Sequence, residues 1–138
     1  MMIDLRRMRY LMDRLPMARL NVERAMSRAT KCTQRLTMAA GGGGYGDAMS
    51  ENAIRLSVAR EKRDGILREL RELREALAPR IAELDDPVQR LIMQMRYLDG
   101  QSARQIAYAL ALSERWVFYN LSRAEASINA EIKQEPPE

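Results

Sequence analysis

Apolar residues recur every three or four positions through most of this chain, which is the spacing of amphipathic helices. In residues 1–36, nine of the eleven positions on one seven-residue repeat are apolar. That repeat runs through Met1, Leu5, Met8, Met12, Leu15, Arg19, Val22, Met26, Ala29, Thr33 and Leu36. Such a narrow stripe is typical of helices that pair as coiled coils. Pro16 lacks a backbone donor and clashes one turn back, so we expect a kink or break near residue 15.

A second stripe with the same repeat predicts a helix over residues 48–84. Its eleven positions, eight of them apolar, are Met49, Asn52, Leu56, Ala59, Arg63, Ile66, Leu70, Leu73, Leu77, Arg80 and Leu84. Pro79 should end or bend this helix. Between the two helices, five of the six residues 41–46 are glycine, so we expect a flexible connector over residues 39–47.

The two stripes together predict an antiparallel helical hairpin over residues 1–84. Neither helix can bury its apolar stripe alone. The helices therefore pair with each other, with a second copy of the chain, or both. We expect a homodimer that forms through this segment.

Capping signals mark the start of a separate region after residue 84. Asp86 can cap a helix whose first position suits Pro87, and that helix should run to about Leu98. The pair Asp99-Gly100 ends it, because glycine accepts the left-handed conformation. The final residues, 133–138, are polar and rich in proline, and we expect them to be a disordered tail.

Two further serine caps predict a helix-turn-helix. Ser102 with Gln105 three residues later forms a capping box for a short helix over residues 103–110. Ser113 caps a longer helix from residue 114 to about residue 132. A short helix, a turn of about three residues and a longer helix are the arrangement of DNA-binding helix-turn-helix domains. We therefore assign residues 85–132 to such a domain, in an all-α protein.

Helical periodicity divides the final helix into an inward and an outward face. At 100° per residue, Leu121, Ala124 and Ile128 lie within about 40° of Val117, so this stripe should face the core. The same core should take in Ile106, Ala107 and Leu110 of the preceding helix. The opposite face carries Arg115, Tyr119, Ser122 and Arg123, with Trp116 and Asn120 beside it and Phe118 on the other shoulder.

An arginine–tyrosine–arginine ladder on an exposed helix face suits the major groove of DNA. Arginine can bind guanine in a bidentate manner, and tyrosine or serine can reach a phosphate. The candidates for base contact are Arg115, Trp116, Tyr119, Asn120 and Arg123. The candidates for phosphate contact are Arg104, Gln105, Ser113 and Ser122. The alternative interpretation is an ordinary solvated helix face that carries two arginines.

The charge distribution does not by itself favour DNA binding by the helix-turn-helix. The net charge is +4, but residues 1–46 contribute +6, residues 47–84 zero and residues 85–138 −2. DNA affinity at physiological salt needs several phosphate contacts. Additional cations would have to come from Arg90, Arg96 and Arg104, or from the basic N-terminal helix.

The residue types argue against catalysis. The 138 residues include one cysteine, Cys32, and no histidine, which excludes an intramolecular disulfide, zinc sites of Cys and His, and histidine-dependent triads. The chain has no phosphate-binding glycine motif. We expect no enzyme activity, metal or cofactor. No apolar run is long enough to span a bilayer and no signal peptide is visible, so we expect a cytoplasmic protein that does not enter a membrane.

The segment "LDDPVQRLIMQMRYLDGQSARQIAYALALSERWVFYNLSRAEASI" resembles the fourth conserved region of bacterial sigma factors. It shares the "RY-x-x-G-x-S" junction, the "IA-x-x-L-x-x-S" run, and the later "V" and "RA". The likeness is closer to small phage regulators of the RinA and ArpU type, which carry sigma-like helix-turn-helix domains. They also tend to carry a helical hairpin with a glycine-rich loop. The turn position usually held by glycine is Ala111, so we expect a reshaped turn.

The resemblance implies a transcription regulator of phage or prophage genes, more specifically an activator, that binds double-stranded DNA. RNA polymerase is a further possible partner. Two alternatives remain open. One is a small subunit of a phage DNA-packaging terminase, which would form a ring. The other is a module that binds RNA polymerase or a sigma factor without touching DNA.

Overall fold

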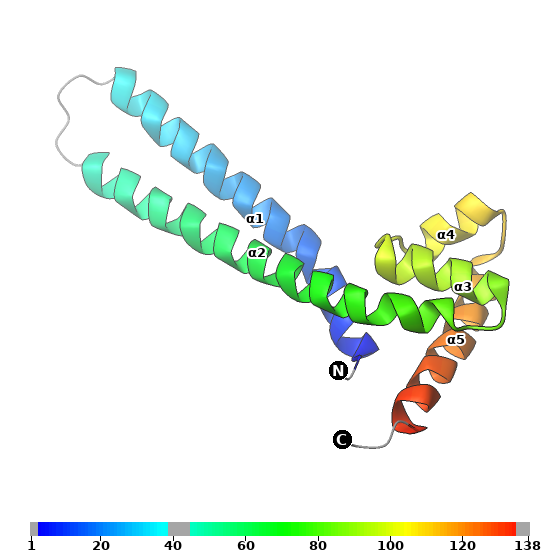
Figure 1. The fold of residues 1–138 in the computed structure, drawn as a ribbon. Coiled ribbons are helices and arrows are strands. Elements are labelled where there is room, and N and C mark those ends of the chain that lie inside the picture. Colours follow the sequence, from blue (N-terminus) through cyan, green and yellow to red (C-terminus); the bar gives the residue numbers. More distant parts are fainter. Residues whose placement is uncertain (1–2, 39–44, 135–138) are drawn as a thin grey trace. The chain divides into compact units, whose positions relative to one another are not determined.

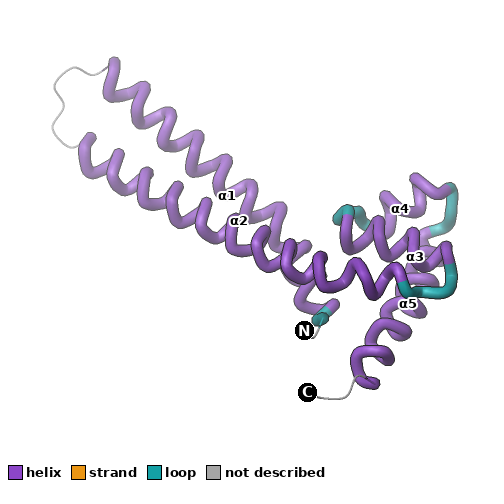
Figure 2. Tube along the Cα trace, viewed as in Figure 1, coloured by secondary structure: helices purple, strands orange, loops and turns teal. Residues whose placement is uncertain are grey.

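The computed structural model describes residues 3–38 and 45–134, and in those residues it contains helices and no strand. Figure 2 shows that loops are confined to the first described residues and the short joins between the later helices. The all-α prediction is confirmed. The helices are α1 (Leu5–Met38), α2 (Tyr45–Ala82), α3 (Pro87–Met93), α4 (Ala103–Leu110) and α5 (Glu114–Gln134). A π-helical turn, η1 (Gln94–Leu98), follows α3 directly.

The chain divides into two compact units. Unit 1 combines residues 1–9 with residues 70–138, and unit 2 is the segment Tyr10–Glu69 between them. Both long helices are therefore shared between the units. The expected division at residue 84 does not coincide with this one, because the last part of α2, from Leu70, belongs to the same unit as the C-terminal helices. Leu70, Leu77 and Ile81 have no exposed surface.

Unit 1 holds most of the large buried side chains. Residues from its two separate stretches contribute, including Met8 from α1 and Ile92 and Met93 from α3. Asp4 caps the beginning of α1, where its Oδ1 accepts a hydrogen bond of 3.1 Å from the amide of Arg7. Each fully buried aliphatic side chain contributes about 1.5–3 kcal/mol. The first turns of α1 are therefore part of the core of unit 1.

In unit 2, α1 and α2 run side by side in opposite directions (Figure 1). The buried stripe of α1 consists of Leu11, Ala18, Val22 and Ala25. The sequence repeat instead placed Arg19 and Met26 on the seam, and both are exposed, so that choice was wrong. The physical reason is that small alanines allow close approach of the helices, whereas burial of Arg19 would remove an unpaired charge from water.

Neither proline ends its helix where the sequence suggested. α1 continues through Pro16, and α2 continues for three residues beyond Pro79. Both prolines are exposed, so water can hydrate the carbonyl that lacks a donor. The long packed segments on either side offset the remaining cost.

Two boundaries of the expected loops also differ. α2 begins at Tyr45, so residues 45–47 of the expected connector are helical, while residues 39–44 lie outside the described residues. α5 extends to Gln134, and the rest of the expected tail, residues 135–138, lies outside the described residues.

The helix expected to run from Pro87 to Leu98 changes character after Met93. The turn η1 is π-helical, and the amide of Asp99 donates to the carbonyl of Gln94 at 3.0 Å. Gly100 then takes a left-handed conformation with φ of 75°, as expected for the glycine that ends a helix. This π turn, which is wider than an α-helical turn, contains Tyr97, whose large side chain is fully buried.

Candidate nucleic-acid interface

Both serine caps of the helix-turn-helix form as predicted. In the capping box of α4, the amide of Gln105 donates to Ser102 Oγ at 3.2 Å, and the amide of Ser102 donates to Gln105 Oε1 at 2.9 Å. At the start of α5, the amide of Trp116 donates to Ser113 Oγ at 3.1 Å. These bonds satisfy amides that a helix start leaves without partners and fix where each helix begins.

The turn between α4 and α5 keeps the left-handed residue despite the lack of glycine. Ala111 has φ 55° and ψ 41°. The amide of Leu112 donates to the carbonyl of Ala107 at 2.9 Å, and the amide of Ala111 donates to that of Tyr108 at 3.4 Å. This is the hydrogen-bond pattern of a Schellman motif. The expected reshaping of the turn is therefore wrong, and Ala111 is held in a conformation that costs about 1–2 kcal/mol for an L-residue.

The core-facing edge of α5 is the predicted one. Val117, Leu121, Ala124 and Ile128 are buried, as are Ile106 and Ala107 of α4, while Leu110 is half-buried. Both α3 and α4 pack against α5. Because two helices cover this edge, the opposite face of α5 is turned to solvent.

The outward face of α5 carries an ordered aromatic and cationic stack. The rings of Trp116 and Tyr119 lie 5.4 Å apart with an interplanar angle of 19°. Arg123 Nη1 donates a hydrogen bond to the Tyr119 hydroxyl, and the guanidinium carbon lies 5.4 Å from the centre of that ring. The three side chains therefore form one continuous exposed surface along the helix.

Arg115 and Arg104 are exposed and form no hydrogen bond or ion pair with any residue that the structure describes. Ser122 is exposed on the same face of α5 as Arg115. The side-chain oxygens of Ser113 and Gln105 accept the capping bonds, which leaves the serine hydroxyl hydrogen and the glutamine amide group as donors. All four predicted phosphate-contact residues are thus at the surface with donors available.

Asn120 was placed wrongly by the sequence interpretation. Its side chain is only 4% exposed, and its Nδ2 donates to the carbonyl of Trp116 at 2.9 Å. Asn120 lies about 60° from Val117 on the helical wheel, close enough to share the buried edge. It is therefore excluded from the exposed face and from the base-contact candidates.

Two exposed aromatic residues were not selected from the sequence. Tyr108 is 91% exposed on α4, and Phe118 is 56% exposed on α5. Tyr108 follows Ile106 by two residues, which places it about 200° from that buried side chain. The same helical-wheel argument applied to α4 would have identified it.

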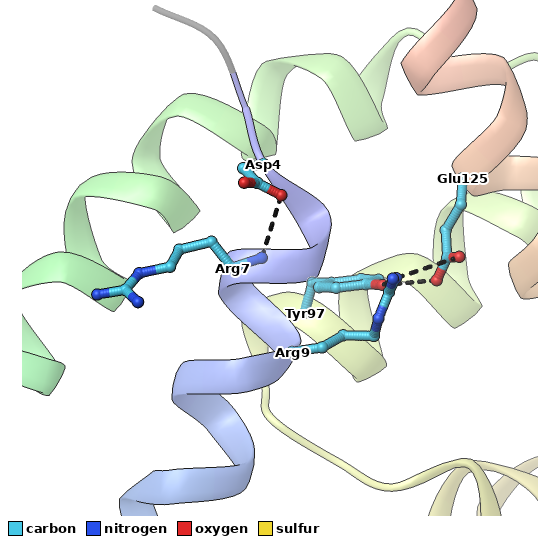
Figure 3. Close-up of polar contacts among 5 residues, drawn as sticks. All are labelled: Asp4, Arg7, Arg9, Tyr97 and Glu125. Atoms are coloured by element: carbon cyan, nitrogen blue, oxygen red, sulfur yellow. Dashed lines mark hydrogen bonds and ion pairs between the residues drawn. The ribbon is translucent and has the colours of Figure 1, made fainter.

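A partly buried polar cluster joins α5 to the beginning of α1 and to η1 (Figure 3). The Tyr97 hydroxyl donates to Glu125 Oε1 at 2.5 Å and accepts a bond of 2.9 Å from Arg9 Nη1. Arg9 also lies 3.4 Å from Glu125 Oε2. Burial, followed by the bond to Glu125 and its charge, raises the pKa of Tyr97 to about 12. The neutral hydroxyl is thus the form that the fold stabilises.

No family model, curated protein or solved structure matches this chain. The resemblance to sigma-like phage regulators therefore remains a prediction from the motifs of residues 84–128. Among the described residues, no helix has an apolar stretch that is long enough to cross a bilayer.

The left-handed conformation of Ala111 predicts a stabilising substitution. Ala111→Gly should raise the free energy of unfolding by about 1 kcal/mol, because glycine adopts this conformation without the steric penalty. The matched control is Ala126→Gly, in the exposed middle of α5, which should lower it by about 1 kcal/mol. Urea unfolding followed by circular dichroism measures both. Destabilisation by both substitutions would contradict the assigned turn.

The raised pKa of Tyr97 predicts a loss of stability at alkaline pH. The ordinary pKa of tyrosine is 10.0, and in the folded chain it is about 12. The stabilisation is full below about pH 10 and is lost between about pH 10 and 12 as the hydroxyl ionises. The free energy of unfolding, measured with urea, should therefore fall more over this pH interval in the wild type than in Tyr97→Phe. The same pH dependence in both proteins would show that the Tyr97 hydroxyl does not contribute.

Proposed function

We propose that the protein is a sequence-specific DNA-binding regulator that places α5 in the major groove. The observation that carries the proposal is the outward face of α5, on which Arg115 and Arg123 are exposed opposite the buried Val117 edge. The regulatory role, activation of phage or prophage genes together with RNA polymerase, rests on the resemblance of residues 84–128.

The dimensions of α5 suit this role. The 21-residue helix is about 30 Å long, and an α-helix fits the major groove, which is about 12 Å wide. Arg115 and Arg123 are eight residues apart, or about 12 Å along the axis, which spans three to four base pairs. Tyr119 lies between them in the stack with Trp116 and Arg123. These side chains are thus spaced to contact successive bases or phosphates.

A second candidate function is protein docking by the same domain. The exposure of Tyr108 and Phe118 favours it, because large exposed aromatic side chains commonly mark protein contacts. The balanced charge of unit 1, with 12 basic and 12 acidic residues, also gives no general attraction to DNA. The two candidates differ in whether the arginines of α5 discriminate between DNA sequences.

The expectation of a homodimer is also part of the proposal, and the thin packing of unit 2 supports it. Among the side chains of α1 described in this unit, from Tyr10 to Lys31, the buried apolar ones are one leucine, one valine and two alanines. In the part of α2 from Met49 to Glu69, no described side chain is fully buried, and Ile54 and Val58 are exposed. A long two-helix hairpin with so small a core gains stability when a second copy covers it.

Binding to selected DNA tests the main proposal. Duplexes enriched from a random-sequence pool by the wild type should bind Arg115→Ala and Arg123→Ala about 5- to 150-fold more weakly in gel shifts, because each arginine contributes about 1–3 kcal/mol of base discrimination. Arg71→Ala, an exposed arginine of α2 in the same unit, should bind as the wild type does. Failure to enrich any sequence at low salt would contradict DNA reading and leave protein docking as the function.

Light scattering tests the dimer. The chain has a mass of 15.9 kDa, and the wild type should give twice this value at micromolar concentration. A monomer would contradict the role given to unit 2. A ring of eight or nine copies would instead support a packaging subunit, which uses a helix-turn-helix in a different assembly.

A further inference from the structure

One side of α1 in unit 2 is exposed from Tyr10 to Lys31 and carries positive charge. Its members are spaced by three and four residues, so they form one stripe, about 100° around the helix from the buried edge. The basic stripe consists of Tyr10, Arg14, Met17, Asn21, Arg24, Arg28 and Lys31, all of them exposed. Asp13 lies within the stripe near its beginning, whereas Glu23 lies outside it, about 100° around the helix from Arg24.

The net charge of the protein lies in the unit that contains this stripe. Unit 2 has 11 basic and 7 acidic residues, whereas unit 1 has 12 of each. On α2 within unit 2, cations and anions alternate, and Arg55–Glu51 and Arg63–Asp64 form ion pairs at 2.8 and 2.9 Å. The part of the basic stripe from Arg24 to Lys31 has three cations and no acid.

These three cations are not explained by the stability of the hairpin. Arg24, Arg28 and Lys31 form no hydrogen bond or ion pair with the residues that the structure describes. Like charges three or four residues apart on a helix destabilise it by a few tenths of a kcal/mol per pair. A polyanion lying along the stripe would turn this repulsion into attraction.

The polyanion that fits is the phosphate backbone of DNA. A helix that binds a membrane surface needs a broad apolar face beside its cations, and the apolar side chains Leu11 and Val22 of α1 are buried in the hairpin. We propose that the basic stripe binds phosphates of double-stranded DNA without reading the base sequence. This inference rests on the proposed function, and it assigns affinity to unit 2 and sequence discrimination to α5.

The salt dependence of DNA binding tests the stripe. Neutralisation of three phosphate-binding cations should reduce the slope of log K against log salt by about 2.7. The triple variant Arg24→Gln/Arg28→Gln/Lys31→Gln should therefore bind selected and random duplexes about 10- to 100-fold more weakly at about 0.1 M salt, with their ratio unchanged. The matched control is Arg60→Gln/Lys62→Gln/Arg68→Gln, an equal change of charge at three exposed positions of α2, and it should retain most of the slope.

The possible outcomes distinguish failure of the inference from failure of the proposed function. An equal loss in the control would show a general charge effect, and a loss confined to the selected sequence would show base reading. A wild-type slope in the stripe variant, while Arg115→Ala loses discrimination, would reject the stripe and leave the proposed function intact. If instead Arg115→Ala and Arg123→Ala keep full discrimination while the stripe variant loses affinity, base reading by α5 fails, and phosphate binding by the stripe is the only part that is supported. Binding to phosphatidylserine vesicles but to no duplex would reject both.

Discussion

The burial of one edge of α5 determines the direction of every other side chain on that helix. Val117, Leu121, Ala124 and Ile128 lie against α3 and α4, and a helix advances by 100° per residue. The outward positions of Arg115 and Arg123 are a geometric consequence of that burial, and so is the inward position of Asn120. The capping bonds of Ser113 and the left-handed Ala111 fix where this rotation begins.

Under the proposed function, the charge distribution explains how a unit with no net charge can take part in DNA binding. Affinity for DNA depends mainly on phosphates and salt, while specificity depends on a few groups at base edges. Under the proposed function these requirements fall to different helices, α1 for the backbone and α5 for the bases. A neutral unit 1 would then limit non-specific attraction at the surface that has to discriminate.

Signals that act over a few residues could be predicted from the sequence. The caps at Ser102 and Ser113 and the buried edge of α5 depend on neighbours within one or two helical turns, and all of them appear in the structure. The choice between Ala18 and Arg19 at the seam could not be settled in the same way, because both positions fit a seven-residue repeat. The outcome depends on which side chain the opposite helix accepts.

Contacts between distant parts of the chain could not be predicted from the sequence pattern. Arg9 and Tyr97 are 88 residues apart, and nothing in the pattern around either residue indicates the other. The π turn at Gln94–Leu98 was missed for a related reason, since its residues favour an ordinary helix and the change appears only where Tyr97 is packed. The candidate surface was accordingly predicted well except at its border, where Asn120 turns inward.

The interrupted path of the chain through unit 1 has a consequence for how the protein folds during synthesis. Its first nine residues and its last 69 belong to one compact body, and the 60 residues of unit 2 are inserted between them. On the ribosome, Ile3, Leu5 and Met8 emerge long before the helices that bury them. The hairpin of unit 2 can form while these three side chains are still exposed to solvent. The bonds that join Arg9 to Tyr97 and Tyr97 to Glu125 can form only after residue 125 has been synthesised.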